Sequence, residues 1–254
     1  MSSALEWLVA GIAALGAGSV NAVAGGGTLI TFPTLVALGL PSVTANVTNA
    51  VALCPGYFGG TLAQRRSLAG QRARVRRIAG AAAAGALLGS ILLLVSSDEL
   101  FSALVPFLIL GATALLALQD RIRTWLGRVP PTPGAALVDP PALGVLVFVA
   151  GVYGGYFGAG LGIMLLAVLG VVLHEPLPRV NALKQVVSLI VNLVAAGLFV
   201  LSGKVAWGFA AAMAVGSLAG GQLGGALAER VRPAVLKALV VVVGLVVGVV
   251  YLVR

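Results

Sequence analysis

The chain has 254 residues, of which 60% are hydrophobic and 9% charged, with a formal net charge of +9. Soluble domains carry roughly 25% charged residues, and disorder requires low hydrophobicity, so the composition excludes both and is typical of a polytopic helical membrane protein. The basic residues lie between apolar runs, where they orient a chain in a membrane, so no nucleic-acid partner is expected. A single cysteine, Cys54, excludes an internal disulfide and a cysteine-only metal cage.

Ten apolar segments follow one another along the chain. They run at about 4–24, 27–40, 42–64, 78–96, 99–118, 141–158, 161–173, 179–201, 206–226 and 233–252. A hydrocarbon core of ~30 Å requires roughly 20 helical residues, and most segments meet that length. The short segments 27–40 and 161–173 either span or dip in and return as hairpins. The first segment has no basic region before it, which predicts a retained membrane segment rather than a signal peptide.

The two halves of the chain repeat. Gly25 recurs as Gly158, 133 positions later, and other glycines and leucines of the first half recur at nearly the same offset. The predicted organisation is a first transmembrane repeat at 1–128, a proline-rich cytoplasmic linker at 129–140 and a second repeat at 141–254. Because each half has an odd number of segments, the second half should be inverted relative to the first.

Arginine distribution predicts the topology. Six arginines lie between Arg65 and Arg77, in the loop that follows the third segment. Cytoplasmic loops carry an excess of Lys and Arg, so this loop and the linker should lie inside. Both termini and the turn with Asp98 and Glu99 should lie outside. The single histidine, His174, is interpreted as a solvated interfacial residue on the inner side.

Glycine clusters precede both short segments, at 25–27 and 158–160. In transporters with inverted repeats, matching interruptions of this kind indicate the substrate site. The N–H groups of the following helices, beginning near Thr28 and Leu161, could then bind an anion. Close helix packing, for which small residues serve equally well, is the alternative. The candidate site therefore includes Gly26, Gly27, Thr28, Gly158 and Gly160. The four-residue glycine rows of the ninth segment are interpreted as packing faces.

Polar side chains concentrate in segments 42–64 and 179–201. Asn181, Lys184 and Gln185 share one helical face, and Asn49 is the repeat partner of Lys184. The two segments could face each other across a polar cavity, although interhelical hydrogen bonding or a snorkelling Lys184 is the alternative.

No Asp or Glu lies deep inside an apolar segment. Cation pathways and acid proton relays usually need such acids, whereas Lys, Asn, Gln and backbone N–H groups suit an oxyanion. No nucleophile–base pair, phosphate-binding loop or dinucleotide fingerprint occurs, so no enzyme activity, cofactor or metal site is expected.

Two stretches carry a family resemblance. They are GAGSVNAVAGGGTLITFPTLVALGLPSVTANVTNAVALCPGYFGG and GVYGGYFGAGLGIMLLAVLGVVLHEPLPRVNALKQVV. The chain resembles the sulfite exporter TauE/SafE family. The resemblance implies a plasma-membrane protein that moves sulfite, thiosulfate or organosulfonates. It also implies that six polar residues lie near the pathway: Asn21, Asn46, Asn49, Asn181, Lys184 and Gln185.

Together these patterns predict an all-α polytopic membrane protein, an inverted repeat of two five-segment halves with short glycine-broken helices and 8–10 membrane segments. The expected function is secondary transport of a small sulfur-containing anion by alternating access, in the inner membrane of a bacterium. A passive anion channel is the alternative, and a membrane scaffold a weaker one. The expected partners are the lipid bilayer and a small anionic substrate, and a homo-oligomer is left open.

Overall fold

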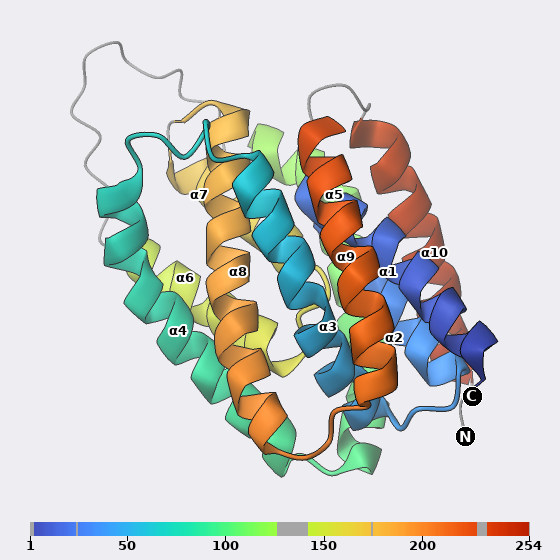
Figure 1. Ribbon diagram of the computed structural model, residues 1–254. Helices are drawn as coiled ribbons and strands as arrows, with labels where there is room; N and C mark the ends of the chain where they lie inside the picture. Colours follow the sequence, from blue (N-terminus) through green and yellow to red (C-terminus); the bar gives the residue numbers. More distant parts are fainter. Residues whose placement is uncertain (1–2, 24, 126–141, 174, 228–232, 254) are drawn as a thin grey trace.

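A computed structural model describes residues 3–23, 25–125, 142–173, 175–227 and 233–253, and within these ranges every regular element is an α-helix (Figure 1). The helices are α1 (Ala4–Val23), α2 (Thr28–Ala37), α3 (Ser42–Ala63), α4 (Arg72–Val95), α5 (Asp98–Trp125), α6 (Ala142–Tyr156), α7 (Leu161–Val172), α8 (Leu177–Leu201), α9 (Trp207–Leu227) and α10 (Pro233–Val253). The predicted all-α class is confirmed.

Two helices extend further than the apolar pattern predicted. Helix α4 begins at Arg72 rather than near residue 78, so the second part of the predicted basic loop is helical. Helix α5 continues past residue 118 to Trp125. The prediction followed hydropathy, but arginine is a good helix former and a helix can continue beyond the apolar layer. The linker at 129–140 and His174 lie outside the described residues.

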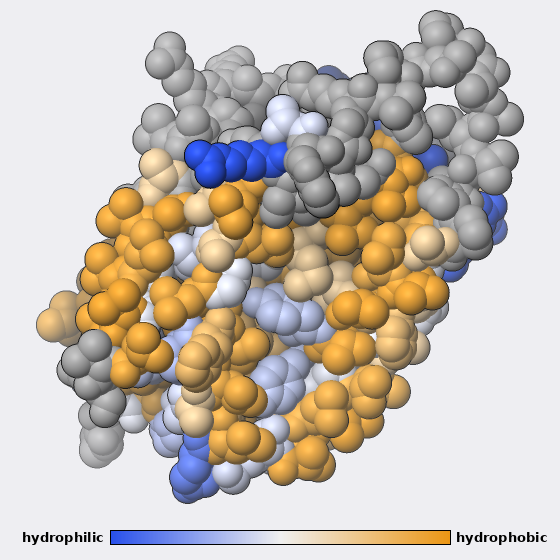
Figure 2. Space-filling view, turned by 180° about the vertical axis from the view of Figure 1, so that it is seen from behind, coloured by the Kyte–Doolittle hydropathy of each residue, from blue (hydrophilic) through white to orange (hydrophobic). Residues whose placement is uncertain are grey.

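Four of the described helices are long and apolar enough to cross a membrane. They are Ala4–Val23, Arg72–Val95, Asp98–Leu115 and Pro178–Leu201. Large apolar side chains are also exposed on their outer faces, for example Leu88 on α4 and Phe107 on α5. Figure 2 shows a largely hydrophobic face, with some weakly hydrophilic residues along its middle and the strongly hydrophilic ones near its edges. Such a surface is unusual for a soluble protein and fits a multi-pass membrane protein.

Helix packing pairs elements from opposite halves. Helix α1 packs along α9 and α6 along α4, while α3 packs against α8 and α5 against α10. Small residues allow the closest approaches: Gly216 lies against the backbone of Gly11, and Gly221 against that of Gly56. The two glycine rows of α9 therefore contact α1 and α3 respectively, which confirms their interpretation as packing faces.

The ends of the bundle differ in charge. The arginine-rich connection between α3 and α4 lies at one end, and the two chain termini lie at the other (Figure 1). The turn from α4 to α5, where Asp98 and Glu99 begin α5, is at the same end as the termini. The predicted grouping of these segments agrees with the structure, and the assignment of the arginine end to the cytoplasm stays a prediction.

Candidate functional site

Both glycine clusters interrupt the helices, as predicted. Gly25 and Gly26 have φ of +83° and +96°, and Gly158 and Gly160 have φ of +76° and +78°. This left-handed region is strained for residues with a Cβ atom. Gly27 differs, because it has helical φ and ψ at the start of α2. The backbone therefore turns sharply in both halves, and all three glycines of the first cluster are buried in protein.

The two interruptions contact each other inside the bundle. A Cβ atom placed on Gly25 would lie 2.8 Å from the Cα of Gly162, and one placed on Gly162 would lie 2.8 Å from the Cα of Gly25. The break before α2 and the first turn of α7 thus meet backbone to backbone. The sequence analysis did not select Gly162. The one signal that could have found it is its place in the GAGLG run directly after the second glycine cluster.

Two backbone N–H groups at the breaks, one in each half, have partners within the protein. The Gly27 N–H donates to Asn21 Oδ1 at 2.7 Å, and the Leu161 N–H donates to the Gly158 carbonyl at 3.1 Å. The Leu161 N–H is thus already bonded within its own turn, and the binding of an anion by the N–H groups of these helices stays a prediction. Asn21, which the resemblance placed near the pathway, holds the first break together.

Lys184 lies in the interior beside both breaks. Its side chain is fully buried, its Cδ passes the position of a Cβ on Gly162 at 3.5 Å, and its Nζ donates to the Asn21 carbonyl at 2.9 Å. The snorkelling alternative is therefore wrong. An ammonium group has three N–H donors, and no carboxylate of the described residues pairs with Lys184.

Several buried polar atoms on α3 and α8 have no hydrogen-bond partner. They are Asn49 Oδ1, Asn181 Oδ1, Gln185 Oε1, Gln185 Nε2 and Ser188 Oγ. Native proteins leave few such atoms, and each needs an explanation. Asn49 is held by one weak bond, from its Nδ2 to Thr28 Oγ1 at 3.4 Å. The predicted polar face is thus buried and largely unsatisfied.

Two predicted site residues instead join the halves through backbone bonds. Asn46 Nδ2 donates to the Tyr156 carbonyl at 2.9 Å, and Asn181 Nδ2 donates to the Ala22 carbonyl at 3.1 Å. Asn181 also donates to Gln64 Oε1 at 2.7 Å. These bonds tie α3 to the end of α6 and α8 to the end of α1. Gln64 was not predicted, because its position beside the arginine loop gave it no distinct pattern.

An ion-pair cluster joins α4 to the start of α8. Glu175 Oε1 lies 3.0 Å from Arg74, and its Oε2 lies 2.6 Å from Arg179. Burial of Glu175 opposes its ionisation, but hydrogen bonds from Arg179 and Arg74 outweigh that effect, so the pKa of Glu175 lies below its usual value. The cluster links the first turn of α4 to the start of α8.

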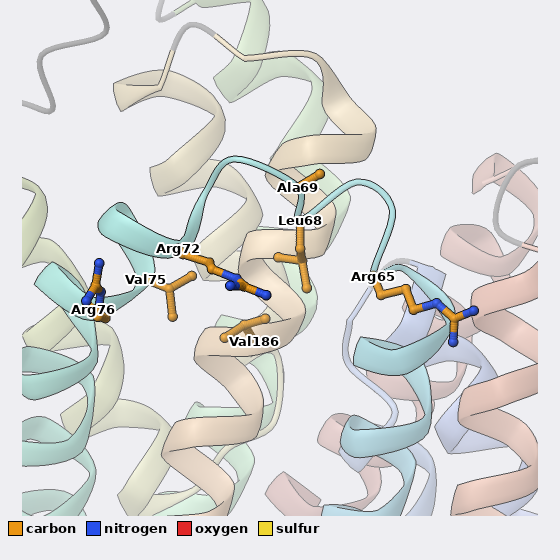
Figure 3. A pocket seen from close by; sticks show the side chains of 7 residues that line it. All are labelled: Arg65, Leu68, Ala69, Arg72, Val75, Arg76 and Val186. Atoms are coloured by element: carbon orange, nitrogen blue, oxygen red, sulfur yellow. The ribbon is translucent and has the colours of Figure 1, made fainter.

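Two hollows open at the arginine end rather than at the buried polar face. The larger has a volume of about 700 Å³ and is lined by Arg65, Leu68, Ala69, Arg72, Val75, Arg76 and Val186 (Figure 3). The smaller, of about 370 Å³, is lined by Gly59, Leu62, Ala63, Arg65, Arg66 and Gln222. None of the predicted site residues lines either hollow, so the two features are distinct.

The fold and its apolar surface define a multi-pass α-helical membrane protein, and comparison with known proteins identifies its family. Residues 10–251 match the family described as sulfite exporter TauE/SafE. A probable membrane transporter protein of Haemophilus influenzae is 30% identical over 207 residues, which are 79% of this chain and 76% of that protein. The chain therefore belongs to the TauE/SafE family and is a membrane transporter.

Other relatives carry the same general name. A probable membrane transporter protein of Sinorhizobium is 28% identical over 83% of this chain and 78% of its own length. The probable membrane transporter protein YfcA of Escherichia coli K12 is 25% identical over 80% of this chain and 74% of its own length. No solved structure matches the chain.

Proposed function

We propose that the protein carries a small sulfur-containing oxyanion or sulfonate through a site between α3 and α8. The observation that carries the proposal is the pair of unpartnered donors Gln185 Nε2 and Ser188 Oγ in the same interior as Lys184, which has no carboxylate partner in the described part of the chain. The family description, which names sulfite, supports the chemical class.

The chemistry of these groups favours an anion. A buried ammonium without an opposite charge is costly, and an oxyanion would supply that charge together with several hydrogen-bond acceptors. The Lys184 ammonium and the Gln185 Nε2 would donate to its oxygens, and charge-assisted hydrogen bonds are roughly twice as strong as neutral ones. Because Gly25 and Gly162 have no side chains, the backbone at their contact could lie directly beside the bound oxyanion.

Burial supports a carrier over a channel. Lys184, Gln185 and Ser188 are fully buried, so the anion can enter only if helices move, whereas a channel needs a continuous pore. The bonds of Asn181 to Ala22 and Gln64 would have to open toward the arginine end. Rocking of one repeat against the other is the general means of such opening. The named relatives are bacterial, which supports a place in the bacterial inner membrane.

A binding screen on purified protein in detergent tests the site. Sulfite, thiosulfate, sulfate, taurine and sulfoacetate would be titrated calorimetrically against wild type, Lys184→Met and Lys204→Met. A charge-assisted hydrogen bond contributes roughly 1.5–3 kcal/mol, so Lys184→Met should bind the preferred anion at least about 10-fold more weakly. Lys204 is exposed in the turn between α8 and α9, so Lys204→Met should bind the anion like wild type.

Lys184→Arg should bind with intermediate affinity, because a planar guanidinium cannot replace a compact ammonium at the Asn21 carbonyl. Wild-type affinity in Lys184→Met would show that the lysine is purely structural and would reject the site.

Counterflow in proteoliposomes separates a carrier from a channel. A carrier loaded inside with unlabelled anion should transiently accumulate labelled anion from outside, because exchange uses one alternating site. A channel only equilibrates the label, and that outcome would favour passive conduction.

A further inference from the structure

The larger hollow at the arginine end combines charge with an apolar wall. Arg65, Arg72 and Arg76 line it together with the apolar side chains of Leu68, Ala69, Val75 and Val186, and the Arg65 guanidinium points away from the others (Figure 3). In Figure 3 the Arg72 side chain extends across the hollow above Val186, between Leu68 and Val75. A hollow of about 700 Å³ with this lining suits an amphiphile that has an anionic head and an apolar tail.

The arginines at the start of α4 are electrostatically unfavourable where they stand. Arg72, Arg74 and Arg76 lie in the first two turns of the helix, next to the positive end of its dipole. Arg74 is compensated by Glu175 at 3.0 Å. Within the described part of the chain, no acidic side chain pairs with Arg72 or Arg76. An anion from outside the protein would balance both the arginine charges and the helix dipole.

The position of the hollow indicates where that anion comes from. It lies where the apolar outer face of α4 gives way to the arginine loop, which is the level of lipid headgroups in a membrane protein. Basic pockets between membrane helices on the cytoplasmic side bind anionic headgroups. A free oxyanion would need no apolar wall.

We propose that the hollow lined by Arg65, Arg72 and Arg76 binds the phosphate headgroup of an anionic phospholipid, with an acyl chain against Leu68, Val75 and Val186. The site lies outside the proposed transport site and does not depend on it. The lipid would fasten the start of α4 to α8 beside the Glu175 cluster.

Binding of acyl-labelled phosphatidylglycerol and phosphatidylcholine to the purified full chain in mixed micelles tests the proposal. Wild type should prefer phosphatidylglycerol. Each basic residue near an anionic lipid surface strengthens binding. The double variant Arg72→Gln/Arg76→Gln should therefore bind phosphatidylglycerol about 30-fold more weakly. The control is Arg121→Gln, since Arg121 is an exposed arginine of α5 outside the hollow, and it should bind like wild type.

A second variant separates this site from a general charge effect. Val75→Trp fills the apolar part of the hollow without a change of charge and should also lose the preference for phosphatidylglycerol. Unaltered binding in the double variant, equal loss in Arg121→Gln, or equal affinity for phosphatidylcholine would overturn the proposal. Displacement of the lipid by inorganic phosphate at constant ionic strength would overturn it too, because the hollow would then be a site for free oxyanions.

Discussion

The central helices α3 and α8 occupy matching places in the two halves but present different side chains to each other. The first pair of repeat partners behaves alike: Asn46 and Asn181 each donate to a backbone carbonyl at the end of the other half's first helix. The next pair differs, since Asn49 reaches Thr28 of its own half, whereas Lys184 crosses to Asn21.

The difference continues along the helices. Directly after Lys184 and one turn beyond it, α8 carries Gln185 and Ser188, whose side-chain polar atoms have no partner. At the matching positions α3 carries Ala50 and the buried Leu53. The symmetric pair links the two halves, and the asymmetric pairs place the fully buried cation Lys184 and most of the unpartnered polar atoms on α8. The residues that match between the two repeats therefore connect the halves, and the residues that differ between them form the candidate site.

The largest expected effect comes from Gly25→Ala, which acts on the contact between the two breaks. The new Cβ would lie 2.8 Å from the backbone of Gly162, at a residue with φ of +83°. Neither backbone can move away without shifting α2 or α7, so transport in proteoliposomes should be abolished. Gly39→Ala is the matched control, because its φ is +91° but no atom lies within 4 Å of the new Cβ.

Gly39→Ala should lose only about 1–2 kcal/mol of unfolding free energy, which is the cost of a left-handed backbone at a residue with a Cβ atom. This variant should still transport the anion. Equal transport by Gly25→Ala and Gly39→Ala would show that the breaks need not touch.

The symmetric pair should respond equally in stability and unequally in binding. Asn46→Ala removes the side-chain donor to the Tyr156 carbonyl. Asn181→Ala removes the donor to Gln64 Oε1, while the Ala22 carbonyl keeps the bond from Gln64 Nε2. Each loss costs about 1–3 kcal/mol of unfolding free energy. Asn181→Ala should also weaken anion affinity, because the Asn181 Nδ2 is a donor on the same face of α8 as Lys184 and can turn from its present acceptors to an anion, whereas Asn46 is followed on α3 by the neutral Asn49 in place of a lysine. Thermal unfolding and calorimetric titration of both variants measure this contrast; identical binding losses would make the two halves equivalent at the site.

Gln185→Met should stabilise the unliganded protein while weakening binding. Both polar atoms of Gln185 are unpartnered, and its Nε2 lies next to Gly60. An apolar side chain of similar volume therefore removes a desolvation cost of roughly 1–2 kcal/mol. Anion affinity should fall several-fold, since the donor at Nε2 is lost. Thermal unfolding without and with saturating anion tests both effects. A variant that is less stable and binds normally would assign Gln185 a packing role.

The smallest expected effect concerns Glu175, which lies outside the comparison of α3 with α8. A variant of this residue tests the ion pairs that link α4 to α8 at the arginine end. Its folded-state pKa lies below its unfolded value, so its stabilisation is present at neutral pH and is lost as pH falls through the folded-state pKa. Glu175→Gln should cost about 1 kcal/mol at pH 7, and the difference from wild type should vanish in acid. Unfolding in detergent between pH 7 and pH 3 measures it, and a difference that persists at low pH would contradict the assignment.

The sequence by itself determined the fold class and the location of both breaks. Hydropathy located ten helices because burial in lipid requires long apolar runs, and paired glycines at a constant offset located the interruptions. It also selected Lys184 and Gln185, because polar side chains stand out in apolar segments. The bounds of α4 were missed, since arginines outside the apolar layer leave no hydropathy signal.

Only the tertiary structure decided which polar groups are satisfied. Asn46 and Asn181 look like Asn49 in the sequence, yet their amides bond to backbone groups of distant segments. Gly162 became significant only because Gly25 lies against it. Hydrogen bonds between residues more than one hundred positions apart depend on how the halves pack. No local sequence pattern encodes that packing. Only the tertiary structure therefore distinguishes the amides that bond to backbone groups from those that have no partner.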